Sequence, residues 1–282
     1  MSDVVHHAHP DPFLDAAEPL LARNAAVRAF VTSWASTWRA DPHARPSIAV
    51  TYGRDAAHGL ALQREGPLVI ENSDPVAAAA IADELATRGV RLAHVIGEEA
   101  GCAAFAAAWQ RHVACAAATG MRMRHHMLTT LQPFAGAAGA MRPAQEADLA
   151  WLTRNALGFA RDARLPDRPE QVRASVRRRV RGGDMRVWVN GARVAFASVA
   201  RVGALDARIG LVYTLARHRR HGYATALVGA MVRERLAAGT ERVFLLTDAD
   251  NPTSNALYAR LGFRAVSDQV RLDLRPPPQA RE

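Results

Sequence analysis

The sequence contains no lysine, few cysteines and few aromatic residues, and each shortage argues against a class of protein. All 36 basic residues among the 282 are arginine and 27 residues are acidic, so the formal net charge is +9. Two cysteines, Cys102 and Cys115, are too few for a disulfide framework and lack zinc-ligand spacing. Aromatic residues make up 6% of the chain, which is sparse for a surface that stacks nucleic-acid bases. The positive charge still favours anionic partners such as phosphates.

Long apolar runs are also missing. No stretch approaches the roughly 20 residues of a membrane-spanning helix, and residues 1–12 lack the basic and apolar segments of a secretory signal. We therefore expect a cytoplasmic protein without a membrane partner. No group of His, Cys, Asp or Glu has metal-ligand spacing, so we expect no metal. Hydrophobic residues make up 49%, which is enough for the core of one large or two ordinary domains.

The first half of the chain alternates between helix-like and strand-like patterns. Apolar positions from Phe13 to Trp34 recur at helical spacing and predict one helix over residues 12–39. Ser73 or Asp74 is expected to cap a later helix. The predicted strands lie at 47–53, 59–63, 67–72, 91–97 and 121–131, and the further helices at 75–88 and 99–112.

Small residues and prolines fill residues 132–143, where we place a boundary between a domain of residues 1–135 and one of residues 136–282. Asn190-Gly191 predicts a hairpin, and we expect the tail, residues 275–282, to be disordered. The second half has predicted strands at 140–142, 186–191, 193–202, 207–215, 242–248, 263–268 and 269–274, and predicted helices at 145–160, 169–181, 223–238 and 253–261.

The two halves share an order of elements. Each has antiparallel strands followed by strand, helix, strand, helix and strand. A tandem duplication explains this order, although ordinary α/β alternation also produces it. The pattern predicts an α/β (α+β) fold with a mixed, mostly antiparallel sheet flanked by helices.

The stretch Arg217–Leu227, RHRRHGYATAL, joins a predicted strand to a predicted helix through Gly222. The first amide groups of a helix lack internal partners and carry partial positive charge, so they form a binding site for anions. The dinucleotide fingerprint and the Walker loop are both absent. The sequence therefore predicts a phosphate-binding loop of another kind.

From Arg219 to Ala224 the chain reads Arg-Arg-His-Gly-Tyr-Ala, which resembles the Arg/Gln-x-x-Gly-x-Gly/Ala loop of the GNAT superfamily of acyl-CoA-dependent N-acyltransferases. Residues 251–263, NPTSNALYARLGF, are similar to the family's second signature, Asn…Tyr-x-x-x-Gly-Phe. The resemblance covers about residues 140–274. It implies a tandem GNAT-like fold with a degenerate N-terminal half, similar in arrangement to the glycine N-acyltransferases. The loop of residues 71–78, ENSDPVAA, lacks the first signature and carries two acidic residues, so the first half should not bind coenzyme A.

The resemblance also implies acetyl-CoA as co-substrate and a role for each matching residue. Backbone amides of residues 220–225 would hold the pyrophosphate, and the arginines of the loop would approach the 3′-phosphate. Tyr258 would act as general acid toward the departing thiolate, and an amide of Val212 or Tyr213 would polarise the thioester carbonyl. The residues implied to bind the co-substrate are Val212, Tyr213, Thr214, Arg219, Arg220, His221, Gly222, Tyr223, Ala224, Thr225, Asn251 and Asn255.

One departure from the family leaves the general base open. Arg208 stands near the strand position where many members carry a glutamate implicated as base. Asp206, Asp248, Asp250 and His218 are candidates by proximity in sequence, and the acceptor could instead lose its proton to water or arrive already neutral. A purely structural role also stays open for the residues of the two signatures. Tyr258 would then be a core tyrosine, Asn255 an ordinary helix residue, and the arginines part of a solvated loop.

These observations predict an N-acetyltransferase whose second half is catalytic. It would transfer the acetyl group of acetyl-CoA directly to a primary amine of a small molecule or amino acid, as a monomer or homodimer. The alternatives are a protein or peptide acetyltransferase and a non-catalytic regulator that binds acyl-CoA or nucleic acid. Nucleic acid is the less favoured partner, because much of the positive charge comes from general arginine enrichment.

Overall fold

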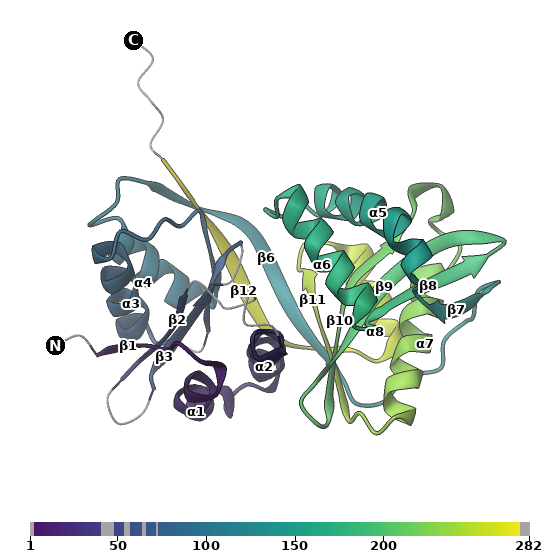
Figure 1. Cartoon of the computed structure of the whole chain (residues 1–282), viewed down its shortest axis with the longest axis horizontal. Helices are drawn as coiled ribbons and strands as arrows, with labels where there is room; N and C mark the ends of the chain where they lie inside the picture. The colour runs from purple at the N-terminus through teal and green to yellow at the C-terminus, as the bar shows by residue number, and fades with distance from the viewer. Residues whose placement is uncertain (1–2, 41–47, 54–56, 64–65, 72, 277–282) are drawn as a thin grey trace, which may run out of the picture. The chain divides into compact units, whose positions relative to one another are not determined.

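The computed structural model forms two compact units that interleave along the chain (Figure 1). Unit 1 comprises residues 1–124, 248–250 and 267–282, and unit 2 comprises residues 125–247 and 251–266. The residues that the structure describes are 3–40, 48–53, 57–63, 66–71 and 73–276.

Both units combine a mixed, mostly antiparallel sheet with flanking helices, which confirms the predicted fold class. The predicted boundary near residue 136 falls between β6 (Ala116–Leu128) and β7 (Ala140–Pro143), inside unit 2, and stays a prediction. The tail predicted to be disordered lies outside the described residues, apart from Arg275 and Pro276.

In unit 1 the strands are ordered β1-β2-β3-β4-β5-β12, and the β4–β5 pair is parallel. Asp74 caps α3 by accepting a hydrogen bond from the Ala77 amide at 2.8 Å, as one of the two predicted caps. The elements are β1 (Val4–His6), α1 (Pro10–Leu21), α2 (Ala25–Ala40), β2 (Ile48–Tyr52), β3 (Gly59–Gln63), β4 (Leu68–Glu71), α3 (Pro75–Thr87), β5 (His94–Gly97), α4 (Glu99–Trp109) and the later part of β12 (Arg264–Arg275).

The prediction of a single helix over residues 12–39 is wrong, because one helix ends at Leu21 and a second begins at Ala25. The carboxamide of Asn24 accepts hydrogen bonds from the amides of Ala26 (3.0 Å) and Val27 (3.2 Å). An asparagine in this position is a helix cap, and it lies inside an otherwise continuous apolar pattern. The two closing strands predicted at 263–268 and 269–274 are likewise one strand, β12.

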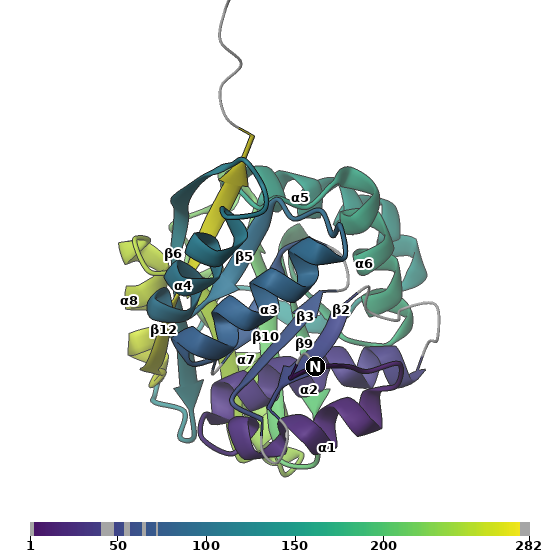
Figure 2. The same ribbon diagram turned by 90° about the vertical axis from the view of Figure 1, so that its left-hand side faces the viewer.

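The sheet of unit 1 buries both faces. Val50 and Ile70 pack with residues of α3 and α4, whereas Ala49 and Leu60 pack with α1 and α2. Neighbouring strand residues point to opposite faces, so Ala49 and Val50 belong to different cores. Figure 2 shows α3 and α4 side by side over the strands of this unit.

In unit 2 the strands are ordered β6-β11-β10-β9-β8-β7, and the β10–β11 pair is parallel. The predicted Asn190-Gly191 hairpin joins β8 to β9, with Gly191 at a φ of 66°. The elements after β7 are the 3-10 helix η2 (Glu146–Asp148), α5 (Leu149–Asp162), α6 (Pro169–Arg181), β8 (Met185–Asn190), β9 (Ala192–Val202), β10 (Asp206–Thr214), η3 (Ala216–His218), α7 (Tyr223–Ala237), β11 (Arg242–Asp248) and α8 (Pro252–Leu261).

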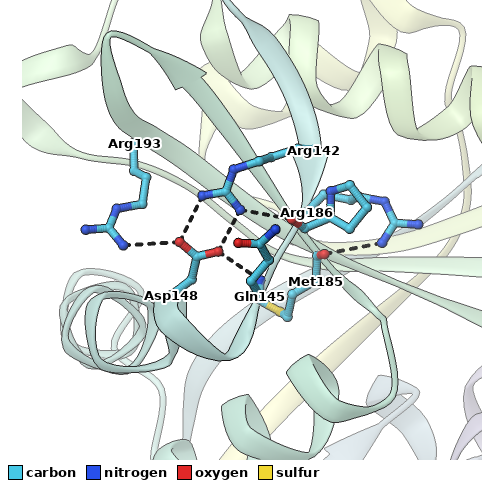
Figure 3. A network of polar contacts seen from close by, with 7 residues as sticks. Arg142, Gln145, Asp148, Met185, Arg186 and Arg193 are labelled. Atoms are coloured by element: carbon cyan, nitrogen blue, oxygen red, sulfur yellow. Dashed lines mark hydrogen bonds and ion pairs between the residues drawn. The ribbon is translucent and has the colours of Figure 1, made fainter.

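The sheet of unit 2 also separates two cores. Ala195 and Ala197 of β9 pack with α7, and Phe196 between them packs with α5 and α6 on the opposite face. An ionic network fixes the start of α5 (Figure 3). The Asp148 carboxylate accepts hydrogen bonds from Arg142 at 2.6 and 2.9 Å and from Arg193 at 3.1 Å. These bonds hold the pKa of Asp148 well below its usual range, with Arg142 as the largest cause.

The sheet opens along β10. The described parallel pairing of β10 with β11 runs from Asp206↔Arg242 to Arg208↔Phe244. After this point β10 has an irregularity between Gly210 and Tyr213, where Leu211 takes a left-handed φ of 51°. The strand then continues to Thr214 along the wall of a cleft.

Candidate functional site

A cleft of about 610 Å³ lies within unit 2. Its walls come from the end of α5, the end of β10, the connection from β10 to α7 (residues 215–222, called here the β10–α7 loop), the start of α7, and α8 with its cap. The lining residues are Phe159, Asp162, Ala163, Val212, Tyr213, Thr214, His218, Arg219, Arg220, Gly222, Tyr223, Ala224, Thr225, Asn251, Thr253, Ser254, Leu257, Tyr258 and Arg260.

The N-terminus of α7 opens into this cleft. Gly222 is the N-cap at a φ of 76° and brings no side chain to the helix end. The first backbone hydrogen bond runs from the Ala226 amide to the Gly222 carbonyl at 3.0 Å, so the preceding amides are donors that the helix leaves without internal partners. Arg220 is also left-handed, at a φ of 65°, and such alternation of backbone conformation turns successive amides toward one point. The arrangement suits an anion.

Glycine is required at position 222 by its backbone conformation rather than by crowding. A Cβ at Gly222 would lie 3.9 Å from Ala137, which is ordinary contact. The left-handed φ itself disfavours residues that carry a Cβ, with asparagine and aspartate the most tolerant.

Arg219 turns toward α5 and is held there. Its Nη2 donates to Asp162 Oδ2 at 3.0 Å, its Nε donates to the Thr214 carbonyl at 3.2 Å, and its guanidinium lies 5.5 Å from the centre of the Tyr213 ring. Tyr213 also donates its hydroxyl to Asp162 Oδ2 at 3.0 Å. The bond from Arg219, followed by that from Tyr213, lowers the pKa of Asp162.

Tyr258 lies in the wall of the cleft and is 7% exposed. Its ring packs edge-on against Phe263, with centroids 5.7 Å apart, and lies 6.2 Å from the ring of His126. Burial raises the pKa of this phenol well above its ordinary value of 10. The side chain therefore stays protonated and keeps a proton that it can donate.

The two asparagines of the second signature differ in position. Asn251 lines the cleft and caps α8, accepting a hydrogen bond from the Ser254 amide at 3.1 Å. Asn255 is not among the lining residues, and its Oδ1 accepts a hydrogen bond from Thr247 Oγ1 at 2.8 Å. His221 is also outside the lining set. It donates from Nδ1 to the Arg219 carbonyl at 2.7 Å and stacks on Tyr223.

Of the four candidate bases, the structure brings His218 to the cleft, where its Nε2 accepts a hydrogen bond from Arg217 Nε at 3.0 Å, but not the aspartates. Asp206 begins β10, at the opposite end from Thr214, and its carboxylate accepts hydrogen bonds from Arg242 at 2.7 and 3.0 Å. Asp248 belongs to unit 1 and accepts a hydrogen bond from the Asp250 amide at 2.9 Å. Neither residue is in the lining set.

Ser254 carries a signal in the sequence, because it precedes Tyr258 by four residues and therefore shares its face of α8. Phe159, Asp162 and Ala163 at the end of α5 have no such signal, because their neighbours in the cleft lie far along the chain. The remaining unpredicted lining residues are Thr253, Leu257 and Arg260.

Among the described residues, no three or more His, Cys, Asp or Glu side chains gather in a way that could hold a metal ion. None of the described helices is both long enough and apolar enough to cross a lipid bilayer.

Comparison with known families and structures confirms the resemblance seen in the sequence. Residues 197–272 match the model of the FR47-like protein family. The matched segment contains most of the cleft, from β10 to α8. No curated protein matches the chain in sequence.

Solved structures show the same fold over nearly the whole chain. A Drosophila protein is 14% identical, with 98% of this chain and 99% of that chain covered and a TM-score of 0.70. A GCN5-related N-acetyltransferase from Sphaerobacter thermophilus is 17% identical, covering 98% and 97%, with a TM-score of 0.62. A tandem GNAT protein from the clavulanic acid biosynthesis pathway is 19% identical, covering 98% and 99%, with a TM-score of 0.58. The chain therefore has the tandem fold of the GCN5-related N-acetyltransferases.

Proposed function

We propose that unit 2 binds acetyl-CoA in this cleft and transfers its acetyl group to a primary amine of a small molecule or amino acid. One observation carries the proposal: the uncapped N-terminus of α7 and the buried phenol of Tyr258 face the same cleft. A site for phosphates and a proton donor are what an acyl-CoA-dependent transferase needs together. The FR47-like segment contains both features, and the similar solved structures include a GCN5-related N-acetyltransferase and a tandem GNAT protein.

The residues of the cleft fit the chemistry of acetyl-CoA. The amides of residues 220–225 would hold the pyrophosphate, since they lie at the positive end of α7. The stretch Val212–Thr214, beyond the described pairing with β11, would offer backbone groups to the pantetheine amides. Bound acetyl-CoA supplies an acetyl group already activated as a thioester.

Tyr258 would donate the proton that the departing thiolate needs. An ordinary phenol, with a pKa near 10, is a weak acid toward a thiolate whose conjugate acid has a pKa near 8.5. Burial raises the pKa of Tyr258, and the same dry surroundings raise that of a thiol formed beside it. Burial therefore shifts the pKa of both groups in the same direction, and proton transfer within the cleft is feasible.

The amine must lose a proton before or during attack. Asp162 is the acidic residue that lines the cleft, and its carboxylate is engaged by Arg219 and Tyr213. We therefore propose that the acceptor arrives as the neutral amine or loses its proton to water. Alignment of the two substrates would then supply most of the acceleration.

A screen of primary amines with acetyl-CoA, following release of free thiol, tests the activity. We expect release with at least one small amine, and a loss of about 100-fold in kcat for Tyr258→Phe with unchanged acetyl-CoA binding in calorimetry. Parent-rate turnover by Tyr258→Phe would remove the general-acid role. Thiol release with peptides alone would favour a peptide acetyltransferase, and acetyl-CoA binding without turnover of any amine or peptide would leave a non-catalytic regulator.

A further inference from the structure

Asp162 occupies a position that helix energetics disfavour. It is the last residue of α5, where the partial negative charge of the helix end opposes a carboxylate. Its side chain is 38% exposed, so burial does not explain its location. The compensation comes from partners at the cleft.

One carboxylate oxygen of Asp162 joins two segments. Asp162 Oδ2 accepts hydrogen bonds from Arg219 Nη2 and from the Tyr213 hydroxyl, both at 3.0 Å. Tyr213 belongs to β10, and Arg219 belongs to the β10–α7 loop. The contact therefore ties the end of α5 to the strand and to the loop that precede α7.

Arg219 is also held by one contact with the end of β10 and one inside its own loop. Its Nε donates to the Thr214 carbonyl at 3.2 Å, and its carbonyl accepts a hydrogen bond from His221 Nδ1 at 2.7 Å. The next residue, Arg220, has the left-handed φ of 65° that helps to turn the amides toward the cleft. A non-glycine residue in this conformation is strained and persists where its surroundings hold it.

We propose that Asp162 is a positioning residue that holds Arg219 and Tyr213, and so fixes the β10–α7 loop in the conformation that presents the α7 amides to ligand phosphates. Arg219 then acts on the ligand through the loop. Arg220 and Arg260 line the same cleft and, among the described residues, form no ion pair, so they supply the side-chain charge to the phosphates. The inference rests on the proposed binding of acetyl-CoA.

Electrostatics and positioning predict opposite signs for the loss of Asp162. Acetyl-CoA carries several negative charges, so removal of a nearby carboxylate that acts by charge alone strengthens binding. Removal of a carboxylate that orders the loop weakens binding. Asp162→Ala removes the charge and both hydrogen bonds, whereas Asp162→Asn removes the charge and keeps an acceptor oxygen.

Calorimetry with acetyl-CoA on the full-length chain measures this sign. We expect Asp162→Ala to weaken binding about fivefold, and Asp162→Asn by less, since a half-exposed pair of this kind is worth a modest amount. Arg219→Gln should weaken binding by a similar factor, and the double variant should lose little more, because both changes break one contact. Glu170→Gln is the matched control. It removes one negative charge from the start of α6 and should leave affinity within a factor of two.

Hydrogen exchange separates positioning from charge. In the ligand-free chain, Asp162→Ala should also speed amide exchange at residues 215–225. Equal or tighter acetyl-CoA binding by Asp162→Ala, or unchanged exchange in this segment, would overturn the inference. Absence of acetyl-CoA binding by the unaltered chain would instead overturn the proposed function, and the exchange measurement would still decide whether Asp162 orders the loop.

Discussion

In each half of the chain a strand with a parallel partner leads into a helix, but the N-termini of the two helices are capped differently. In unit 1 the carboxylate of Asp74 accepts a hydrogen bond from Ala77 and caps α3. In unit 2 the equivalent cap of α7 is Gly222, which leaves the amides open to the cleft. The end of α3 is capped by a carboxylate of its own chain, and the end of α7 has no side-chain cap. The contrast shows that a shared order of elements does not imply a shared site.

The strands before these helices also differ, in how far each stays paired with its parallel neighbour. In unit 1, β4 remains paired with β5 up to Ile70↔Gly97, one residue from its end. A Cβ at Gly97 would lie 2.1 Å from the Ile70 carbonyl, and one at Gly101 would lie 3.1 Å from the Ser73 carbonyl. These glycines therefore allow β5 and α4 to close against the end of β4. In unit 2 the described β10–β11 pairing ends at Arg208, six residues before the end of β10.

The buried acids of the two units differ as well. Asp148 in unit 2 is surrounded by donors, which lower its pKa. Glu71, at the end of β4, is fully buried, and one oxygen accepts a hydrogen bond from Gln269. Its other oxygen has no hydrogen-bond partner among the described residues. Burial raises the pKa of Glu71 from 4.5 to about 8.

An acidic residue at the N-cap of α7, like the one that caps α3, should remove the difference between the two helix ends. We expect Gly222→Asp to weaken acetyl-CoA binding about 1,000-fold, because its carboxylate would take the position and the amides of the ligand phosphates. Calorimetry on the full-length chain measures the loss. Gly222→Asn is the matched control, since asparagine tolerates the same backbone conformation without the charge. Equal losses in the two variants would show that charge at the helix end is not what separates the units.

The stabilities of the two units should depend on pH in opposite ways. The pKa of Glu71 is raised in the folded state, so its contribution to stability is complete below pH 4.5 and is lost as the pH rises toward about 8. Over this range we expect unit 1 to lose about 3 kcal/mol, and Glu71→Gln to remove the dependence. Hydrogen exchange of α3 and α4 peptides measures it in the intact chain. A pH-independent exchange free energy in those helices would contradict the expectation.

Asp148 should show the reverse behaviour at smaller size. Its pKa is lowered in the folded state, so its contribution is present above its ordinary value of 3.8 and is lost as the pH falls below that value. We expect Asp148→Ala to destabilise unit 2 by about 2 kcal/mol at neutral pH, leaving Arg142 and Arg193 without their shared acceptor. Denaturation at pH 7 and pH 3 measures the change. Arg193→Gln is a milder control, because the stronger bonds from Arg142 remain.

The sequence predicted features that local chemistry determines. The turn at Gly222, the cap at Asp74 and the alternation of elements all follow from neighbouring residues. The break at Asn24 was missed because the apolar pattern continues across it. Apolar periodicity reports which face of a helix is buried, and it does not report where the helix ends.

The parts of the site that were missed depend on distant contacts. Asp162 meets Arg219 across 57 positions, and no local pattern signals that meeting. Asp206 was proposed as a base because it stands close in sequence to the predicted site, yet β10 is extended and carries it to the far end of the strand, beside Arg242. Direction along a strand and helix-to-loop contacts follow from tertiary packing, so they require the structure.

The smallest expected effect tests whether the acid at α3 is the whole difference between the two halves. Asp74→Gly gives α3 the same cap residue as α7, and we expect unit 1 to lose about 0.5 kcal/mol or less through the missing cap. It should gain no affinity for pyrophosphate in calorimetry, because β4 and β5 stay paired and the buried Glu71 carboxyl remains at the strand end. Asp74→Asn should keep the cap and the stability. Appearance of a second pyrophosphate site in Asp74→Gly would mean that the single acid, and not the closed pair of strands, keeps the first half from binding phosphates.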